Sequence, residues 1–329
     1  MRAIEITGKG GGPEALRLTE RELVAVIAPD EVILRVVAAG VTRDDILQRR
    51  GLYDAPEGVT DIPGLEVSGV VEAVGAAATR FKVGDRVCAL LPGGGYAEYA
   101  IAHESLCHEI PGSMDMQLAA CLPKSMFTAW SSIFMRGKLR AGETLLVHGG
   151  TSGVGVMAIQ MAHQCGASVY VTTGDSEKKR LCIRLGARMA IDRSMEDYAM
   201  VLRRVVPDGI NVVLDMSGGG VLARDMEIMA PDGRHVSIAH MSGKTAQIDI
   251  PTLMRKRLIL TGATLRGRPM AEQAAIAADL DLKIWPMIAN GRVTPVLDKV
   301  FPLEYAAEAH RHIESGKHRG KVVLSVSNP

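Results

Sequence analysis

A glycine turn between an apolar strand and a helix is the clearest sign of chemistry in this 329-residue chain. Residues 145–158 read LLVHGGTSGVGVMA, in which Gly153, Gly155 and Ala158 fit the spacing G-x-G-x-x-G/A. In that spacing the glycines allow a tight turn and a close backbone approach, and the N–H groups that begin the helix hold a pyrophosphate. A second apolar strand follows at residues 168–173, so the context of a dinucleotide site is complete. A purely structural turn is the alternative.

The residues after the second strand indicate which dinucleotide binds. An NAD site carries Asp or Glu about 20 residues beyond the glycines, bound to the ribose 2′-hydroxyl. Here the strand ends at Thr173 and Gly174, and the cations Lys178 and Arg193 follow as candidates to bind a 2′-phosphate. The sequence therefore favours NADP. Asp175, one residue past the usual acidic position, leaves NAD open, and a solvated helix face is the alternative for the cations.

The sequence contains no pattern of metal ligands and no nucleophile motif. The nine histidines are dispersed, and we expect His310 and His312 on a solvated helix face rather than as ligands. Ser152 does not meet the G-x-S-x-G spacing of a nucleophile elbow, so we expect it to bind a cofactor phosphate. Cys121 is expected to be a core residue, as free cysteines usually are. The sequence therefore predicts no metal and a reaction carried by the dinucleotide.

The composition is that of a globular protein, with 47% hydrophobic and 23% charged residues. The net charge of +1 and the absence of a basic stripe make nucleic acid an unlikely partner. The five cysteines form no C-x-x-C pair, which fits a reducing compartment. The first 20 residues do not resemble a signal peptide, and no apolar run approaches the ~20 residues that span a bilayer. We therefore expect a cytoplasmic protein that makes no membrane contact.

Strand and helix patterns alternate from about residue 142 to 263, which predicts a doubly wound parallel sheet. The six expected strands are 145–148, 168–173, 188–191, 210–215, 234–238 and 258–262. The first 120 residues instead show short strands between Gly and Pro turns, which predicts a small barrel-like β domain. The last ~65 residues hold two helix patterns and a closing strand at 321–324, and we expect them to return to that first domain.

Motifs spread over the whole chain carry a family resemblance. Residues 84–87 (GDRV) and 150–155 (GTSGVG) are together specific for a superfamily, and residues 51–53 (GLY) and 264–266 (TLR) narrow it to one branch. The chain resembles the zinc-independent quinone oxidoreductases (zeta-crystallin-like, p53-inducible quinone oxidoreductase-like) of the medium-chain dehydrogenase/reductase superfamily. The resemblance implies an α/β fold in which a Rossmann doubly wound sheet is inserted into a GroES-like β-barrel catalytic domain.

The resemblance also implies domain boundaries and a set of site residues. Residues 1–122 and 264–329 would form the catalytic domain, and residues 123–263 the NADP-binding domain. Tyr53 would form the substrate wall, with a loop tyrosine packed on the domain surface as the alternative. Thr42 would line the nicotinamide side. The residues expected to contact the cofactor are Thr128, Thr151, Ser152, Gly153, Val154, Gly155, Gly174, Lys178, Arg193, Ser217, Leu265 and His318.

Two positions depart from the family pattern. Thr42 stands where the family usually has Asn, and its hydroxyl is shorter and lacks the amide donor. Lys124 stands where the family often has Glu. Zinc-dependent relatives place Cys near position 42 and His just before Glu66, where this chain has Thr42 and Leu65, so no catalytic zinc is expected.

The sequence thus predicts NADPH-dependent reduction of quinones or related α,β-unsaturated carbonyls by hydride transfer without a metal. The alternative is an NADPH-binding regulatory or RNA-binding protein of the zeta-crystallin type. A homodimer is expected as well, because the apolar strand at 258–263 should lie at an edge of the sheet, where unpaired backbone groups invite pairing. The resemblance implies that two such edges meet. A covering loop or C-terminal helix is the alternative.

Overall fold

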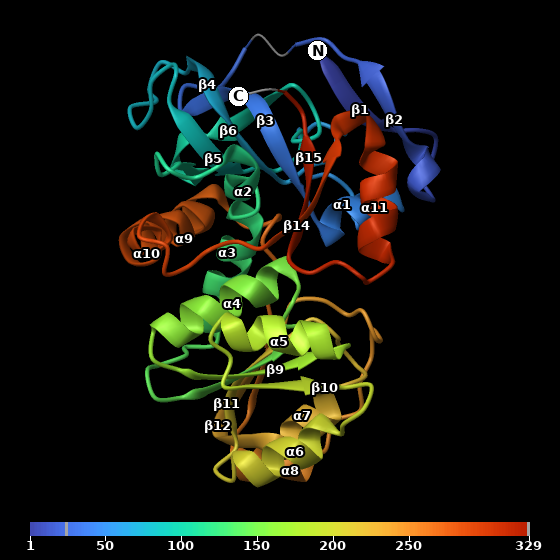
Figure 1. Cartoon of the computed structure of the whole chain (residues 1–329), viewed down its shortest axis with the longest axis vertical. Helices are drawn as coiled ribbons and strands as arrows, with labels where there is room; N and C mark the ends of the chain where they lie inside the picture. Colours follow the sequence, from blue (N-terminus) through green and yellow to red (C-terminus); the bar gives the residue numbers. More distant parts are fainter. Residues whose placement is uncertain (24–25, 328–329) are drawn as a thin grey trace. The chain divides into compact units, whose positions relative to one another are not determined.

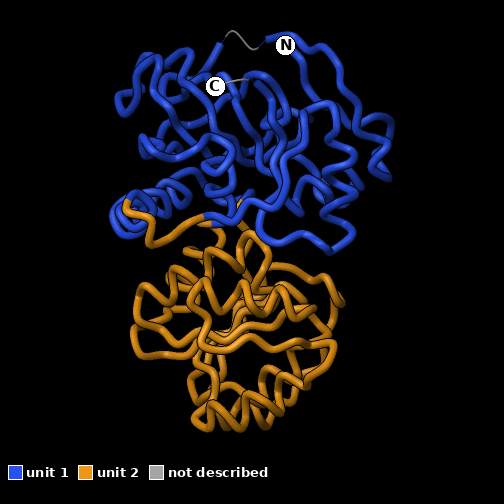
Figure 2. Tube along the Cα trace, viewed as in Figure 1, with its two compact units in different colours: residues 1–125, 266–289, 295–329 blue, residues 126–265, 290–294 orange. Residues whose placement is uncertain are grey.

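The computed structural model describes residues 1–23 and 26–327 and divides the chain into two compact units (Figures 1 and 2). Unit 1 comprises residues 1–125, 266–289 and 295–329, and unit 2 comprises residues 126–265 and 290–294. Among the described residues, no helix is both long enough and apolar enough to cross a bilayer.

Unit 2 is built on a six-stranded parallel sheet with the order β10-β9-β8-β11-β12-β13. The order changes direction between β8 and β11, as in a doubly wound sheet, so the fold predicted for this part is confirmed. The strands are β8 (Thr144–His148), β9 (Ser168–Thr173), β10 (Met189–Asp192), β11 (Ile210–Asp215), β12 (Met229–Ser237) and β13 (Ile259–Gly262). The helices are α4 (Gly153–Gln164), α5 (Ser176–Arg184), α6 (Tyr198–Val205), α7 (Leu222–Ile228) and α8 (Ile250–Lys256).

The central strands of unit 2 are apolar along their length because parallel strands are usually covered on both faces. Leu145, Leu146 and Val147 of β8 are fully buried, and so are residues 212–214 of β11. Such runs carry no alternation of polar and apolar residues, which is why the sequence could identify them as buried strands. The strand β13 lies at one edge of the sheet, as predicted for residues 258–263.

Unit 1 is mostly β structure. Its seven-stranded sheet has β14-β15-β3-β4-β5-β7 in order, with β6 also paired to β3, and a separate pair is formed by β1 and β2. The strands are β1 (Arg2–Ile6), β2 (Leu16–Glu20), β3 (Glu31–Val41), β4 (Glu66–Val74), β5 (Arg86–Leu90), β6 (Tyr99–His103), β7 (Cys107–Glu109), β14 (Leu297–Pro302) and β15 (Lys321–Ser325). Because β15 pairs with β3, the end of the chain completes the sheet begun near its start.

Most helices of unit 1 are short, but α9 (Met270–Lys283) has 14 residues. The others are α1 (Arg43–Arg49), α2 (Met116–Ala119), α10 (Trp285–Ala289) and α11 (Ala306–Glu314), while α3 (Pro123–Trp130) passes from unit 1 into unit 2 and continues as a π-helical turn at Ser131–Arg136. Single 3-10 turns occur at Pro13–Ala15, Glu104–Leu106 and Leu303–Tyr305. The helix α1 follows β3 directly, so its first residues stand at the end of the longest strand of the sheet.

The compact units of the structure differ from the predicted domain bounds near the end of the Rossmann part. Residues 290–294 belong to unit 2, although the sequence assigned them to the returning catalytic segment. The reason is a pair of hydrogen bonds to one buried side chain: Gln160 Nε2 donates to the carbonyl of Thr294 at 2.8 Å, and the N–H of Thr294 donates to Gln160 Oε1 at 3.0 Å. These bonds hold the segment against α4.

The structure also corrects the placement of His310. This residue of α11 is fully buried rather than solvated, and its Nε2 lies 3.0 Å from the hydroxyl of Tyr96. Burial, assisted by the nearby Arg49, lowers the pKa of His310 to about 3, so the ring is neutral at ordinary pH. The neighbouring His312 is partly exposed and pairs with Asp298 at 2.6 Å.

Candidate functional site

The glycine turn of unit 2 is the segment predicted to hold a diphosphate, and it leads directly into α4. Ser152 begins α4 as its N-cap, since its Oγ accepts from the N–H of Gly155 at 3.0 Å and donates to the carbonyl of Gly149 at 2.9 Å. The two N–H groups that open the helix, at Gly153 and Val154, point beyond the helix as the first donors of every helix do. A Cβ at Gly155 would lie 2.4 Å from the carbonyl oxygen of Gly149, so only glycine fits there. The hydroxyl of Ser152 was predicted to bind a cofactor phosphate. In the structure it forms both of these hydrogen bonds within the turn.

The end of β9 leads into the region predicted to bind a 2′-phosphate. Asp175 is the N-cap of α5 and accepts from the N–H of Lys178 at 2.8 Å. The ammonium group of Lys178 lies 3.8 Å from the same carboxylate. Arg193 is exposed just after β10, and its N–H donates to the carbonyl of Thr173 at 3.1 Å. Lys178 and Arg193 thus both follow the carboxyl ends of the neighbouring strands β9 and β10.

A cavity of about 530 Å³ opens in unit 2 where several parallel strands end. His148 of β8, Thr172 of β9 and Arg193 contribute to its wall. Ser217, which follows β11, also lines it, and its N–H donates to Asp215 at 2.6 Å. Doubly wound sheets bind ligands at the carboxyl ends of their strands, near the change of strand order. Two of the predicted cofactor residues, Arg193 and Ser217, therefore share one cavity.

Beneath this cavity lies a buried polar network that the sequence did not reveal. The carboxylate of Asp225, on α7, lies 3.0 Å from His148 Nε2, 3.1 Å from His235 Nε2 and 2.9 Å from the hydroxyl of Tyr198. Burial alone would raise the pKa of Asp225, but the two histidines lower it to about 2. Burial alone would lower the pKa of His148, yet Asp225 raises it above its ordinary value. Asp225 and the protonated form of His148 therefore stabilise each other in the interior of unit 2.

The remaining predicted cofactor residues lie in different parts of the chain. Thr151 is buried in the glycine turn, and Gly174 follows β9 with open space around the position of a Cβ. Thr128 is partly buried on α3, and Leu265 is the buried residue after which the chain leaves unit 2. His318 belongs to unit 1, just before β15, and is partly buried.

On the predicted substrate side, Thr42 acts as a helix cap. Its N–H and its hydroxyl both donate to Asp45 Oδ2 at 2.7 Å, and its Oγ accepts weakly from the N–H of Asp45 at 3.3 Å. This reciprocal capping box fixes the start of α1. Since the single hydroxyl proton of Thr42 is donated to Asp45, Thr42 must break this bond before it can donate to a substrate.

Tyr53 is partly buried in a loop of unit 1 and lies against Arg266. The guanidinium carbon of Arg266 is 5.4 Å from the centre of the Tyr53 ring. Burial raises the pKa of the Tyr53 hydroxyl, and Asp44 adds to this, while Lys124 and Arg266 act in the opposite direction. Sequence reasoning named Tyr53 but assigned no role to Arg266, although the motif at residues 264–266 contains it.

Lys124, which stands where the family often has Glu, forms an ion pair with Asp44. Its ammonium group lies 2.7 Å from Asp44 Oδ2, and its N–H donates to Glu66 Oε2 at 2.8 Å. Lys321 pairs with the same buried Glu66 and donates to the carbonyl of Val41 at 3.0 Å. The carboxylate of Glu66 is thus engaged by Lys321 and by the backbone of Lys124.

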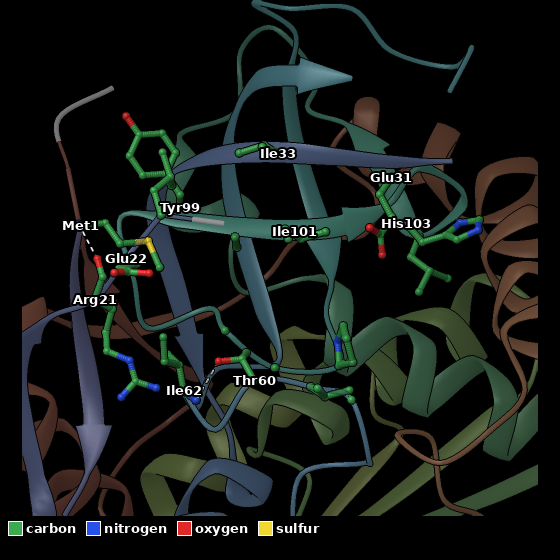
Figure 3. Close-up of a pocket in the computed structure, with 18 of the residues that line it drawn as sticks. Met1, Arg21, Glu22, Glu31, Ile33, Thr60, Ile62, Tyr99, Ile101 and His103 are labelled. Atoms are coloured by element: carbon green, nitrogen blue, oxygen red, sulfur yellow. Dashed lines mark hydrogen bonds between the residues drawn. The ribbon is translucent and has the colours of Figure 1, made fainter. Parts of the chain in front are cut away.

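Unit 1 also contains a cavity of about 830 Å³ beside β3 and β6 (Figure 3). Ile33 and Ile101, which are register partners on the two strands, form part of its wall. Thr60 and Ile62 line it from a loop. Neither Thr42 nor Tyr53 contributes to this wall, so the cavity is separate from the predicted substrate residues.

Within residues 1–23 and 26–327, no group of three or more His, Cys, Asp or Glu side chains is gathered as a metal site requires. Leu65 is buried at the position where zinc-dependent relatives carry His. Cys121 is buried too, as predicted, and burial raises the pKa of its thiol well above the ordinary value. A thiol of this kind is a poor nucleophile.

A mostly β unit combined with a doubly wound nucleotide-binding unit defines the medium-chain dehydrogenase/reductase class. Residues 28–112 match the model of the alcohol dehydrogenase GroES-like domain, and residues 185–324 match that of a zinc-binding dehydrogenase. The GroES-like and Rossmann architecture expected from the sequence is thus confirmed.

Comparison with individual proteins narrows the class to a family. The quinone oxidoreductase of Lama guanicoe is 33% identical over 98% of this chain and 97% of its own length, and the human quinone oxidoreductase is 32% identical over the same shares. The Escherichia coli quinone oxidoreductase, solved in complex with NADPH, matches with a TM-score of 0.87 at 26% identity, over 99% of this chain and 100% of that one. The chain belongs to the quinone oxidoreductase family and is an oxidoreductase.

Proposed function

We propose that this protein reduces quinones, or related α,β-unsaturated carbonyls, with NADPH and without a metal ion. The observation that carries the proposal is the glycine cradle at the start of α4 in a chain whose full-length relatives are quinone oxidoreductases. The Escherichia coli relative was solved in complex with NADPH, and this chain is similar to it over its whole length.

The residues of unit 2 fit a phosphorylated dinucleotide. The cradle at Gly149–Gly155 is shaped for a diphosphate, because its glycines allow close backbone approach and α4 presents its positive end. Lys178 and Arg193 supply positive charge for a 2′-phosphate. Asp175 is occupied as the cap of α5, which argues against its holding a ribose hydroxyl as an NAD site requires.

NADPH supplies a hydride from its nicotinamide ring when it is bound. The task of the chain is then to orient a flat acceptor and to exclude water. A quinone needs no Lewis acid, because its two conjugated carbonyls spread the negative charge. In this proposal Tyr53 forms the wall for the ring, and burial raises the pKa of its hydroxyl, which favours the protonated form. Thr42 contributes mainly by fixing α1.

The proposal is tested by mixing the purified protein with NADPH and a panel of quinones and enones, and by following cofactor absorbance at 340 nm. We expect oxidation of NADPH with quinones, undiminished by a strong chelator. If the protein binds NADPH but oxidises none with any member of the panel, the function is wrong. If a chelator abolishes the activity, the metal-free part of the proposal is wrong.

A further inference from the structure

Arg266 stands out among the charged residues of unit 1. Its side chain is only 7% exposed, and its Nε donates to the carbonyl of Pro92 at 2.8 Å. Its two terminal nitrogens are also buried, yet they have no hydrogen-bond partner among the described residues. Buried donors in native proteins are nearly always paired, so a charged group with two open donors requires an explanation.

The acidic residues nearest to Arg266 do not use these donors. Asp44 pairs with Lys124. Asp45 accepts the N–H and hydroxyl of Thr42, the N–H of Gly64 at 3.0 Å and the hydroxyl of Tyr96 at 3.3 Å. With both carboxylates engaged elsewhere, the guanidinium keeps its terminal nitrogens for another acceptor.

The immediate surroundings of Arg266 indicate what that acceptor is. One hydrogen bond to Pro92 and the contact with the Tyr53 ring hold the guanidinium group in one orientation. A planar cation next to an aromatic side chain fits a flat ring that carries an oxygen at its edge. Arginine remains charged at all ordinary pH values, so it stabilises a negative oxygen but does not protonate it.

Resting on the proposed function, we propose that Arg266 binds one carbonyl oxygen of the quinone and stabilises the negative charge that develops on it. Bound NADPH would supply a hydride, that is, the hydrogen and the electron pair of one C–H bond; the quinone would accept both and become a hydroquinone monoanion, leaving NADP⁺. One proton from solvent then completes the hydroquinone. Arg266 thus supplies the electrostatic stabilisation that a metal ion supplies in other members of the superfamily.

The test separates anion binding from turnover. The probe is the anion of 2-hydroxy-1,4-naphthoquinone, titrated by intrinsic fluorescence with oxidised cofactor present so that no reduction occurs. Arg266→Gln and Arg266→Met are expected to weaken binding of this anion by about 10- to 100-fold, the size of a charge-assisted hydrogen bond. They should weaken binding of neutral 1,4-naphthoquinone less, and leave the Kd for NADPH unchanged. In turnover, kcat/KM for 1,4-naphthoquinone should fall by a similar factor.

Arg86→Gln is the matched control, because Arg86 also donates to backbone carbonyls of unit 1, at Gly112 and Met114. It should lower the melting temperature without changing affinity for the anion. The proposal is overturned if either Arg266 variant keeps its fold and binds the anion within twofold of wild type. If the Gln variant does not fold, the test rests on the Met variant, which preserves the bulk of the side chain. If the wild-type protein oxidises no NADPH with quinones, the proposed function is wrong. The anion titration does not depend on turnover, so it still tests whether Arg266 binds the anion.

Discussion

At the scale of single residues, the choice of cofactor is expected to depend on Lys178. Its side chain is largely buried, and its ammonium group lies 3.8 Å from the capping carboxylate of Asp175. We expect Lys178→Ala to raise the Kd for NADPH far more than that for NADH, by about 1.5–3 kcal/mol of lost charge-assisted bonding. Calorimetric titration with each cofactor measures both values.

The neighbouring lysine provides the control for this prediction. Lys179 pairs with Glu196 at 2.9 Å on the surface, so Lys179→Ala should change neither affinity. Equal losses of NADPH and NADH affinity in the Lys178 variant would remove that residue from the 2′-phosphate site.

Thr42 provides a second prediction at this scale. Because its side chain caps α1, Thr42→Ala should lower the free energy of unfolding by about 0.5–2 kcal/mol. Thr42→Asn, which restores the residue usual in the family, should keep the cap, since Asn is a good N-cap. Both variants should retain quinone turnover near that of wild type, measured by NADPH oxidation below the unfolding transition. If Thr42→Ala keeps its stability but loses its turnover, the prediction is wrong and Thr42 acts in catalysis.

Single residues were also where the sequence was least informative. Tyr53 could be named from a short motif. The orientation of the Arg266 side chain, in contrast, depends on its hydrogen bond to the carbonyl of Pro92, which is 174 positions away in the chain. His310 lies among charged residues on α11, and its local pattern did not show that its ring faces Arg49 and Tyr96. Burial of a polar side chain is decided by distant partners, and no local spacing records them.

At the scale of elements, the parallel sheet was predictable because each strand has a signal of its own. The apolar run of β8 is followed at once by the glycine turn, and β9 begins at the distance that a helical crossover requires. The segment at residues 290–294 was not predictable, since it is held by the side chain of Gln160 rather than by an element. Local periodicity identifies elements but does not assign the links between them.

The network that joins β8, β12 and α7 carries a prediction about stability. Asp225→Asn leaves the buried His148 without its counter-charge, and we expect the free energy of unfolding to fall by about 3–5 kcal/mol at pH 6. Urea unfolding followed by circular dichroism measures the loss. Glu227→Gln is the control on the same helix, because Glu227 is exposed and should contribute little.

The same pair predicts a dependence on pH. The pKa of Asp225 is about 2 in the folded protein, below the value of about 3.9 in an unfolded chain, so its contribution is full above about pH 4 and is lost as the pH falls toward 2. The pKa of His148 is raised, so its contribution is full below about 6.5 and declines as the pH rises through the folded value. The difference in stability between wild type and Asp225→Asn should therefore be largest between about pH 4 and 6.5. A difference that is flat from pH 3 to 9 would contradict the ion pair.

At the scale of the whole molecule, β13 leaves one edge of the unit 2 sheet without a partner among the described strands. The edge is apolar, and Ile259 on it is 55% exposed. Exposed apolar edges of this kind invite pairing with a second chain, and the commonest arrangement of two copies is a two-fold axis. We therefore expect a homodimer in which the two β13 strands pair antiparallel and make one continuous sheet.

Light scattering at micromolar concentration measures the mass of the assembly, and the dimer predicts twice the 35.2 kDa of one chain. Ile259→Lys should shift the mass to that of the monomer, because a charged side chain on an edge strand opposes pairing without disturbing the sheet behind it. Met254→Lys, at an exposed position of α8 in the same unit, is the control and should remain dimeric. If the wild type is a monomer, the edge does not associate. If Ile259→Lys is still a dimer, the two copies meet at another surface.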